Sequence, residues 1–162
     1  MISALPFITQ VDIQAEMFVK EGNPQDVANT AWACGALEIA APTLFAEIDK
    51  RAEYLVEKGS PQNIANIAWA CGKLGFVDAP MLFSQINKKA KVLFDTTTQE
   101  NNNNNTQSVA NIAWACGRLG IQAPDLFSEI DKNAEWFCRN ASPQNIANVT
   151  WACAKLDGFV VT

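Results

Sequence analysis

The stretch Pro61-Gln-Asn-Ile-Ala-Asn-Ile-Ala-Trp-Ala-Cys-Gly-Lys-Leu-Gly75 decides the fold of this 162-residue chain. Its central part, 62–71, recurs without a gap at 25–34, 107–116 and 144–153. The tryptophans of the four copies fall at 32, 69, 114 and 151, so the steps between them are 37, 45 and 37 residues. A fixed period of this length is the signature of stacked supersecondary units rather than of one globular fold. Function is therefore expected on a surface that recurs.

Each unit has the pattern of a helix pair. In the second unit Ser60 is a good N-cap, Pro61 suits the first helical position, and Gly75 is placed to end a helix over 61–74. Apolar residues cover most of this helix, which predicts burial on two sides, against a partner helix and against the next unit. Pro80 opens a second helix that runs to about Phe94, with a narrower apolar stripe at helical spacing.

We predict an all-α fold: an α-solenoid of stacked antiparallel helix pairs with a 37-residue repeat, in about seven helices. The array covers 1–162 as a half repeat at 5–22, repeats at 23–59, 60–95 and 105–140, and a half repeat at 142–156. The segment 95–105 holds eight extra residues and is rich in asparagine, so a flexible Asn-rich loop is expected there. The ragged ends predict a piece of a longer array or an array that self-associates end to end.

Composition excludes several classes of function. Histidine is absent, which removes the commonest general base and metal ligand, and no phosphate-binding glycine loop or nucleophile elbow is present. We therefore expect no enzyme, no catalytic residue, no cofactor and no metal. Four of the five cysteines recur at one position of the repeat. Their spacing fits neither a zinc framework nor a disulfide scaffold, so we expect small core residues in a reducing compartment.

Charge and hydropathy limit the partners. No run of about 18 apolar residues is present, so no membrane span is expected, and the first residues show no targeting peptide. The net charge is −5, opposite to the basic field of most nucleic-acid-binding proteins. Much of the negative charge falls on the predicted second helices, at Glu47, Glu53, Glu129 and Glu135.

The copies can be compared within this one chain, and the exposed arc of the first helix carries the candidate binding residues. They are a recurrent glutamine (Gln25, Gln62, Gln107, Gln144), a polar position that varies (Asp26, Asn63, Ser108, Asn145), a recurrent asparagine (Asn29, Asn66, Asn111, Asn148) and, in three units, a terminal cation (Lys73, Arg118, Lys155). Between asparagine and cation lies an alanine that permits close approach (Ala33, Ala70, Ala115, Ala152).

Outward-facing amides can hydrogen-bond base edges, and terminal cations can hold the phosphates of a single strand. Because a base reader must vary from unit to unit, we predict that the varying polar position chooses the base. A structural interpretation stays open: the asparagines would form a ladder of hydrogen bonds between units, and the cations would complement the helix C-terminus. The tryptophans could stack bases, but their apolar neighbours favour a place in the core.

The motif at 61–75 resembles the octotricopeptide and heptatricopeptide repeats of organellar RNA-binding proteins in algae and protists. It is also similar to the repeat regions of FAST-kinase-like and RAP-domain proteins, and of trypanosomatid RNA-editing substrate-binding complex proteins. The likeness covers almost the whole chain apart from the Asn-rich loop and the C-terminal tail.

The resemblance implies an α-solenoid that binds single-stranded RNA, alone or with other proteins of a ribonucleoprotein complex. Its role would be RNA processing, stability, editing or translation in a mitochondrion or plastid; without the resemblance, a cytoplasmic place would be expected. The alternative is a protein–protein interaction scaffold of the HEAT or armadillo type, with the acidic second-helix layer as its contact surface.

Overall fold

The computed structural model describes residues 3–94 and 102–157, and every regular element within them is an α-helix. In chain order the helices are α1 Leu5–Ile13, α2 Ala15–Glu21, α3 Pro24–Leu37, α4 Pro42–Lys50, α5 Ala52–Lys58, α6 Pro61–Leu74, α7 Pro80–Lys88, α8 Ala90–Leu93, α9 Asn102–Leu119, α10 Pro124–Lys132, α11 Ala134–Asn140 and α12 Pro143–Asp157. The prediction of an all-helical fold is confirmed.

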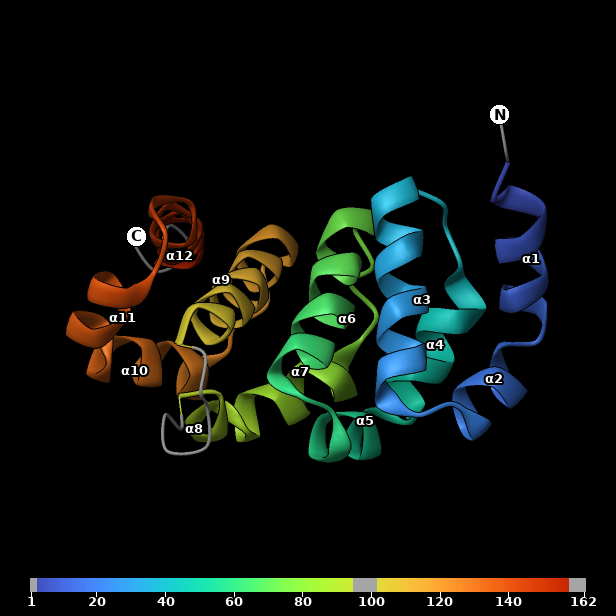
Figure 1. Ribbon diagram of the computed structural model, residues 1–162, viewed down its shortest axis with the longest axis horizontal. Coiled ribbons are helices and arrows are strands. Elements are labelled where there is room, and N and C mark those ends of the chain that lie inside the picture. The colour runs from blue at the N-terminus through green and yellow to red at the C-terminus, as the bar shows by residue number, and fades with distance from the viewer. Residues whose placement is uncertain (1–2, 95–101, 158–162) are drawn as a thin grey trace.

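The helices lie in two layers. In the first layer α3, α6, α9 and α12 pack side by side, each against the next. In the second layer α4 packs on α1 and α2, α7 on α4 and α5, and α10 on α7 and α8. Figure 1 shows the first layer turning progressively, so that α3 is seen side-on and α12 end-on. The arrangement is that of a helical-repeat protein.

The local signals of the first-layer helices are confirmed in α6. Its N-cap is Ser60, whose side chain accepts a hydrogen bond from the Asn63 N–H at 3.1 Å. Its C-cap is Gly75, which adopts the left-handed conformation with φ 66°. Because the helix begins with Pro61 and is capped at both ends by residues suited to those places, its limits coincide with the prediction.

The prediction of about seven helices is wrong, because the second helix of each helix pair is broken near its middle. The breaks fall at Gln14, Arg51, Lys89 and Asn133, none of which is proline or glycine. At Asn133 the side-chain amide donates to the Glu129 carbonyl, so it competes with the helical hydrogen bond to the same oxygen. At Arg51 the guanidinium instead reaches the carbonyls of Val19 and Gly22 at the end of α2.

Consecutive units of the second layer are joined by a recurring hydrogen bond. The eighth residue of one helix accepts from the N–H of the third residue of the next, where the first-turn donors lack a helical partner. The pairs are Asp12 with Leu44 at 2.7 Å, Asp49 with Leu82 at 2.7 Å, and Asn87 with Leu126 at 3.1 Å. This bond sets the register of each unit on its neighbour.

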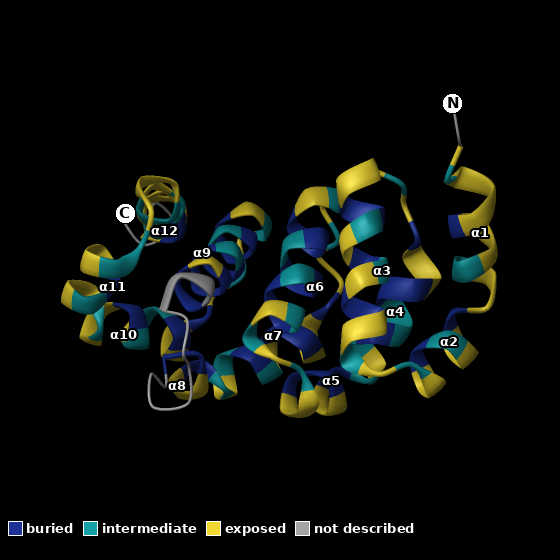
Figure 2. Ribbon diagram, in the orientation of Figure 1, coloured by how far each residue is buried: buried dark blue, intermediate teal, exposed yellow. Residues whose placement is uncertain are grey.

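The core lies between the two layers (Figure 2). Its largest fully buried side chains include Phe45, Phe137, Leu44, Ile67 and Leu82. The predicted Asn-rich loop is shorter than expected, because α9 begins at Asn102 and Asn105 is 2% exposed within the helix. The remainder of that loop, 95–101, lies outside the described residues.

Candidate nucleic-acid interface

One side of the first layer carries the polar residues that recur in every unit. At about 100° per residue, Gln62, Asn66, Trp69 and Lys73 of α6 fall within about 60° of one another, on a stripe about 16 Å long. We call the four equivalent stripes the first-layer face: Gln25, Asn29 and Trp32; Gln62, Asn66, Trp69 and Lys73; Gln107, Asn111, Trp114 and Arg118; Gln144, Asn148, Trp151 and Lys155. All four glutamines and Asn29 are exposed, and the other asparagines are half-buried.

Three of the four alanines of the exposed arc do not lie on this face, contrary to prediction, and the fourth, Ala33, is half-buried. Ala70, Ala115 and Ala152 are all fully buried. A Cβ added at Gly72 would lie 3.2 Å from the Cα of Ala115, so each of these alanines packs on a glycine of the preceding first-layer helix. The close approach that alanine permits is between neighbouring helices and leaves no room for a ligand.

The tryptophans lie partly in solvent, and the prediction that they belong to the core is wrong for two of them. Trp32 is 49% and Trp151 is 37% exposed, whereas Trp69 and Trp114 are half-buried. The rings of Trp32 and Trp69 stack with centroids 6.4 Å apart and planes at 23°. Cζ3 of Trp69, Trp114 and Trp151 would lie 2.8 to 3.1 Å from a Cβ added at the glycine of the preceding first-layer helix. Part of each of these rings is therefore covered by the neighbouring helix, and part remains exposed.

The position predicted to choose the base has a local structural role. It is the third residue of α3, α6 and α12 but the seventh of α9, and Asp26 and Asn63 close capping boxes with Asn23 and Ser60. Asp and Asn can both make such bonds, so the difference between these two units needs no ligand to explain it. Ser108 is only 3% exposed and cannot reach an RNA strand. The amide nitrogen of Asn63 is not used by the capping box.

This role predicts how α6 responds to substitution. Asn63→Asp keeps the acceptor for the Ser60 N–H and should leave the free energy of unfolding unchanged to within about 0.5 kcal/mol. Asn63→Ala removes that acceptor and should cost about 1 kcal/mol. Urea unfolding of both variants checks the difference, and an equal cost would argue against the capping box.

The recurrent asparagines do not form the predicted ladder between units. Among the described residues, no hydrogen bond links the side chains of Asn29, Asn66, Asn111 and Asn148 to one another or to a neighbouring helix. The spacing of the first-layer helices is set by the glycine–alanine contacts, so the amides face outward with donors and acceptors available.

The three cations sit in the last turns of α6, α9 and α12, as predicted. Lys73 pairs with Glu38 of the preceding unit at 3.0 Å. The Lys155 ammonium lies 5.6 Å from the centroid of the Trp151 ring. Arg118 is exposed. All three remain at the surface, where an exposed ion pair is worth little and a phosphate can replace it.

A polar cavity of about 440 Å³ brings three of the predicted residues together. It lies between the N-terminal ends of α9 and α12 and is lined by Thr106, Gln107, Asn140, Ala141, Ser142, Gln144 and Asn145. Gln107 and Gln144 belong to neighbouring units and thus line the same cavity. It offers amides and hydroxyls without a carboxylate, which suits the polar edge of a base.

The cysteines behave mainly as core residues. Cys34, Cys71 and Cys116 are buried, and burial raises the pKa of Cys71 and of Cys116 to about 12.

In the ranges 3–94 and 102–157, no group of three or more Cys, Asp or Glu is arranged to hold a metal ion. None of the described helices is both long and apolar enough to cross a membrane.

Thiol chemistry gives a test of this burial. At pH 8 the exposed Cys138 should react quickly with a chromogenic disulfide reagent. Cys71 and Cys116 should react only when the chain unfolds, because they are inaccessible and almost wholly protonated. Cys138→Ser should abolish the fast phase, and rapid reaction of either buried thiol in the native protein would contradict the packing.

Comparison with protein-family models, with curated proteins and with solved structures finds no match to this chain. The first-layer face and the chemistry of its residues are therefore the basis for the function.

Proposed function

We propose that the chain is an α-solenoid of stacked helix pairs with a 37-residue repeat, and that it binds single-stranded RNA along the first-layer face. The observation that carries the proposal is a repeated constellation: an exposed glutamine, an outward asparagine without an internal partner and a partly exposed indole recur in all four first-layer helices. The solvated surface of an ordinary helix carries mixed charges, and it does not require the same glutamine, asparagine and tryptophan in every repeat unit.

Each group has a role in holding a single strand. The amides of Gln62 and Asn66 can donate to and accept from base edges, which are available only when bases are unpaired. The indole edges offer apolar surface against which a base or ribose can pack, and such stacking contributes about 1–3 kcal/mol per base. Lys73, Arg118 and Lys155 would hold phosphates. No step involves a covalent change, so the proposed role is binding and not catalysis.

The biological setting follows only from the resemblance of the repeated motif. By that resemblance we propose a part in organellar RNA processing, stability, editing or translation, within a ribonucleoprotein complex. The alternative is a protein–protein scaffold that uses the acidic second layer, where three of the four carboxylates predicted for its contact surface have a basic neighbour. Glu129 pairs with Lys132 at 2.9 Å, and Glu47 and Glu135 pair with Lys50 and Arg139.

A charge-matched pair of variants tests the face. The triple variant Gln62→Glu, Gln107→Glu and Gln144→Glu places three carboxylates on the first-layer face. Its affinity for a single-stranded RNA pool should fall at least tenfold, or about 1.4 kcal/mol, through lost amide contacts and repulsion of phosphates. The control, Thr43→Glu, Ser84→Glu and Ser128→Glu, adds the same charge at exposed positions of the second layer and should retain the wild-type affinity. Equal loss in both variants would place binding elsewhere.

A further inference from the structure

The two ends of the described chain carry complementary halves of one helical unit. Within residues 3–94 and 102–157, α12 is a first-layer helix without a second-layer helix after it, and α1 with α2 is a second-layer pair without a first-layer helix before it. We propose that two copies of the chain associate head to tail, so that α12 of one copy and α1–α2 of the next complete a composite unit. The inference is independent of RNA binding, because the surfaces used are the ends and not the first-layer face.

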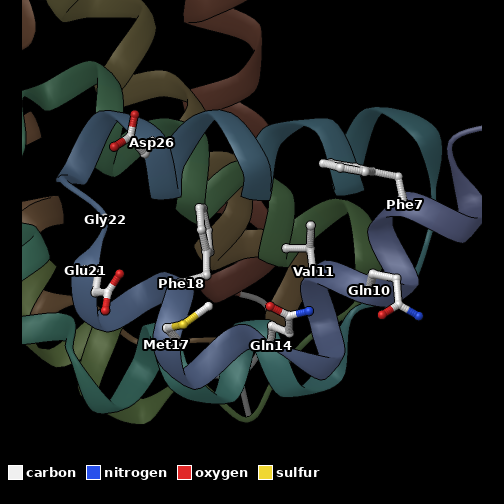
Figure 3. A pocket seen from close by; sticks show the side chains of 9 residues that line it. All are labelled: Phe7, Gln10, Val11, Gln14, Met17, Phe18, Glu21, Gly22 and Asp26. Atoms are coloured by element: carbon white, nitrogen blue, oxygen red, sulfur yellow. The ribbon is translucent and has the colours of Figure 1, made fainter.

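The receiving surface is an apolar groove at the N-terminal end. Its cavity of about 480 Å³ lies between α1–α2 and α3 and is lined by Phe7, Gln10, Val11, Gln14, Met17, Phe18, Glu21, Gly22 and Asp26. Figure 3 shows Val11 and Phe18 pointing from α1 and α2 toward α3, with Phe7 at the other end of the cavity. Inside the chain, three first-layer helices show what fills such a place. α3 lies beside α6 and precedes the second-layer pair α4–α5. In the same way, α6 lies beside α9 and precedes α7–α8, and α9 lies beside α12 and precedes α10–α11.

Equivalent residues are covered inside the chain and open at this end. Phe7 is 74% exposed, whereas Leu44, which holds the same place one unit later, is completely buried. Val11 and Phe18 are half-buried, whereas their counterparts Ile48 and Leu55 are each 1% exposed. Of the exposed large apolar side chains within residues 3–94 and 102–157, Phe7 and Met17 line this groove, and Leu5 and Ile13 belong to the same helix α1 as Phe7. An apolar concentration of this kind marks an interaction surface.

The opposite end offers the matching surface. Cys153 and Ile146 of α12 are half-buried, whereas their counterparts Cys71 and Ile64 are 0% and 4% exposed. Cys153 and Leu156 line a cavity of about 250 Å³ together with Gln122, Ala123, Pro124, Phe127, Asp131 and Asp157. In the inner units, the corresponding space is filled by the next second-layer helix. Phe7 and its neighbours on α1 have the apolar character to fill it.

One hydrogen bond fixes the register of the proposed joint. Asp131 is the eighth residue of α10, the place of the acceptors Asp12, Asp49 and Asn87, but no described residue donates a hydrogen bond to its carboxylate. The Phe7 N–H is in the third position of α1, the place of the donors Leu44, Leu82 and Leu126, and no described residue accepts from it. In the composite unit, the Phe7 N–H of one copy donates to the Asp131 carboxylate of the other.

A single substitution in the last unit makes this joint looser than those inside the chain. The glycine of the inner first-layer helices is replaced by Ala154 in α12. At Gly35, Gly72 and Gly117, an added Cβ would meet the next helix at 2.8 to 3.0 Å. The α3 helix of a second copy must therefore stand slightly farther from α12, and the association is expected to be reversible.

Sedimentation velocity of residues 1–162 over a range of concentrations tests the proposal. The sedimentation coefficient of the wild-type protein should increase with concentration, because each copy can bind a second copy through α12 and a third through α1–α2. Phe7→Glu blocks the groove and Ala154→Glu blocks α12. Both residues are exposed, so the variants should fold and each should be monomeric. An equimolar mixture of the two should form dimers only, since one intact end of each kind remains.

Two further variants test the geometry of the joint. Asp131→Ala should raise the dissociation constant about tenfold, because it removes one charge-assisted hydrogen bond. Ala154→Gly should lower the dissociation constant, because it restores the close helix contact of the inner units. A wild-type protein that stays monomeric, blocked variants that associate as the wild type does, or a mixture that stays monomeric would overturn the proposal.

Discussion

Replacing Gly72 by leucine is expected to lower the free energy of unfolding by about 3 kcal/mol or more. A Cβ at this position would lie 2.8 Å from Cζ3 of Trp114 and 3.2 Å from the Cα of Ala115, and the latter is backbone that cannot rotate away. Leucine is the better helix former by roughly 0.8–1 kcal/mol, but overpacking at the α6–α9 contact outweighs that gain. Urea unfolding followed by circular dichroism measures the net effect.

Gly75 supplies the matched control, since it lies three residues away in the same unit. Nothing lies within 4 Å of a Cβ at Gly75, but its φ of 66° disfavours any other residue. Gly75→Leu should therefore cost only the conformational strain, about 1–2 kcal/mol. If Gly72→Leu were no more harmful than Gly75→Leu, the direct packing of neighbouring first-layer helices would be wrong.

Phe45→Ala is the second substitution with a large expected effect, about 3–5 kcal/mol of unfolding free energy. Phe45 is 1% exposed, and its ring centroid lies 5.5 Å from that of Phe76, which belongs to the following unit. The substitution leaves a cavity where the two layers and two consecutive units meet. Loss of cooperativity is expected as well, because each unit is stabilised largely by its neighbours.

Phe7→Ala is the matched control for Phe45→Ala. The same side chain is removed, but Phe7 is 74% exposed, so the free energy of unfolding should change by no more than about 0.5 kcal/mol in dilute protein. A small effect at Phe45 would show that the proposed core does not lie between the layers.

Local signals in the sequence predict the limits of α6 well, but not the start of α9, which begins at Asn102 within the predicted loop. The limits of α6, from the Ser60 cap to Gly75 in the left-handed conformation, depend on residues that favour those places irrespective of the rest of the chain. The breaks in the second helices are not predictable in this way. Arg51 and Asn133 are both compatible with an unbroken helix. The Arg51 side chain bonds to the Gly22 carbonyl of another unit, whose position depends on the folded structure, whereas the Asn133 side chain bonds locally to the Glu129 carbonyl.

The candidate site was only partly predictable for a similar reason. Helical periodicity places Gln62 and Asn66 on one face, and in the structure Gln62 is exposed and Asn66 half-buried. It also places Trp69 at the edge of the apolar arc, where burial depends on how closely the next helix approaches. That distance is set by a contact such as Gly35 with Ala70, which lie in different units. The varying position at Asn63 pointed to recognition, but its capping bond to Ser60 becomes visible only in three dimensions.

Titration of the chain with a random-sequence single-stranded RNA pool tests the central claim most directly. Tryptophan fluorescence should be quenched, since the indoles reach the first-layer face. With three cations on that face, the slope of log affinity against log salt should be about −2, roughly a 20-fold loss between about 50 and 200 mM salt. Double-stranded RNA should bind much more weakly, because its base edges are not available. Unchanged fluorescence and no binding of single-stranded RNA at the lower salt concentration would contradict the proposal.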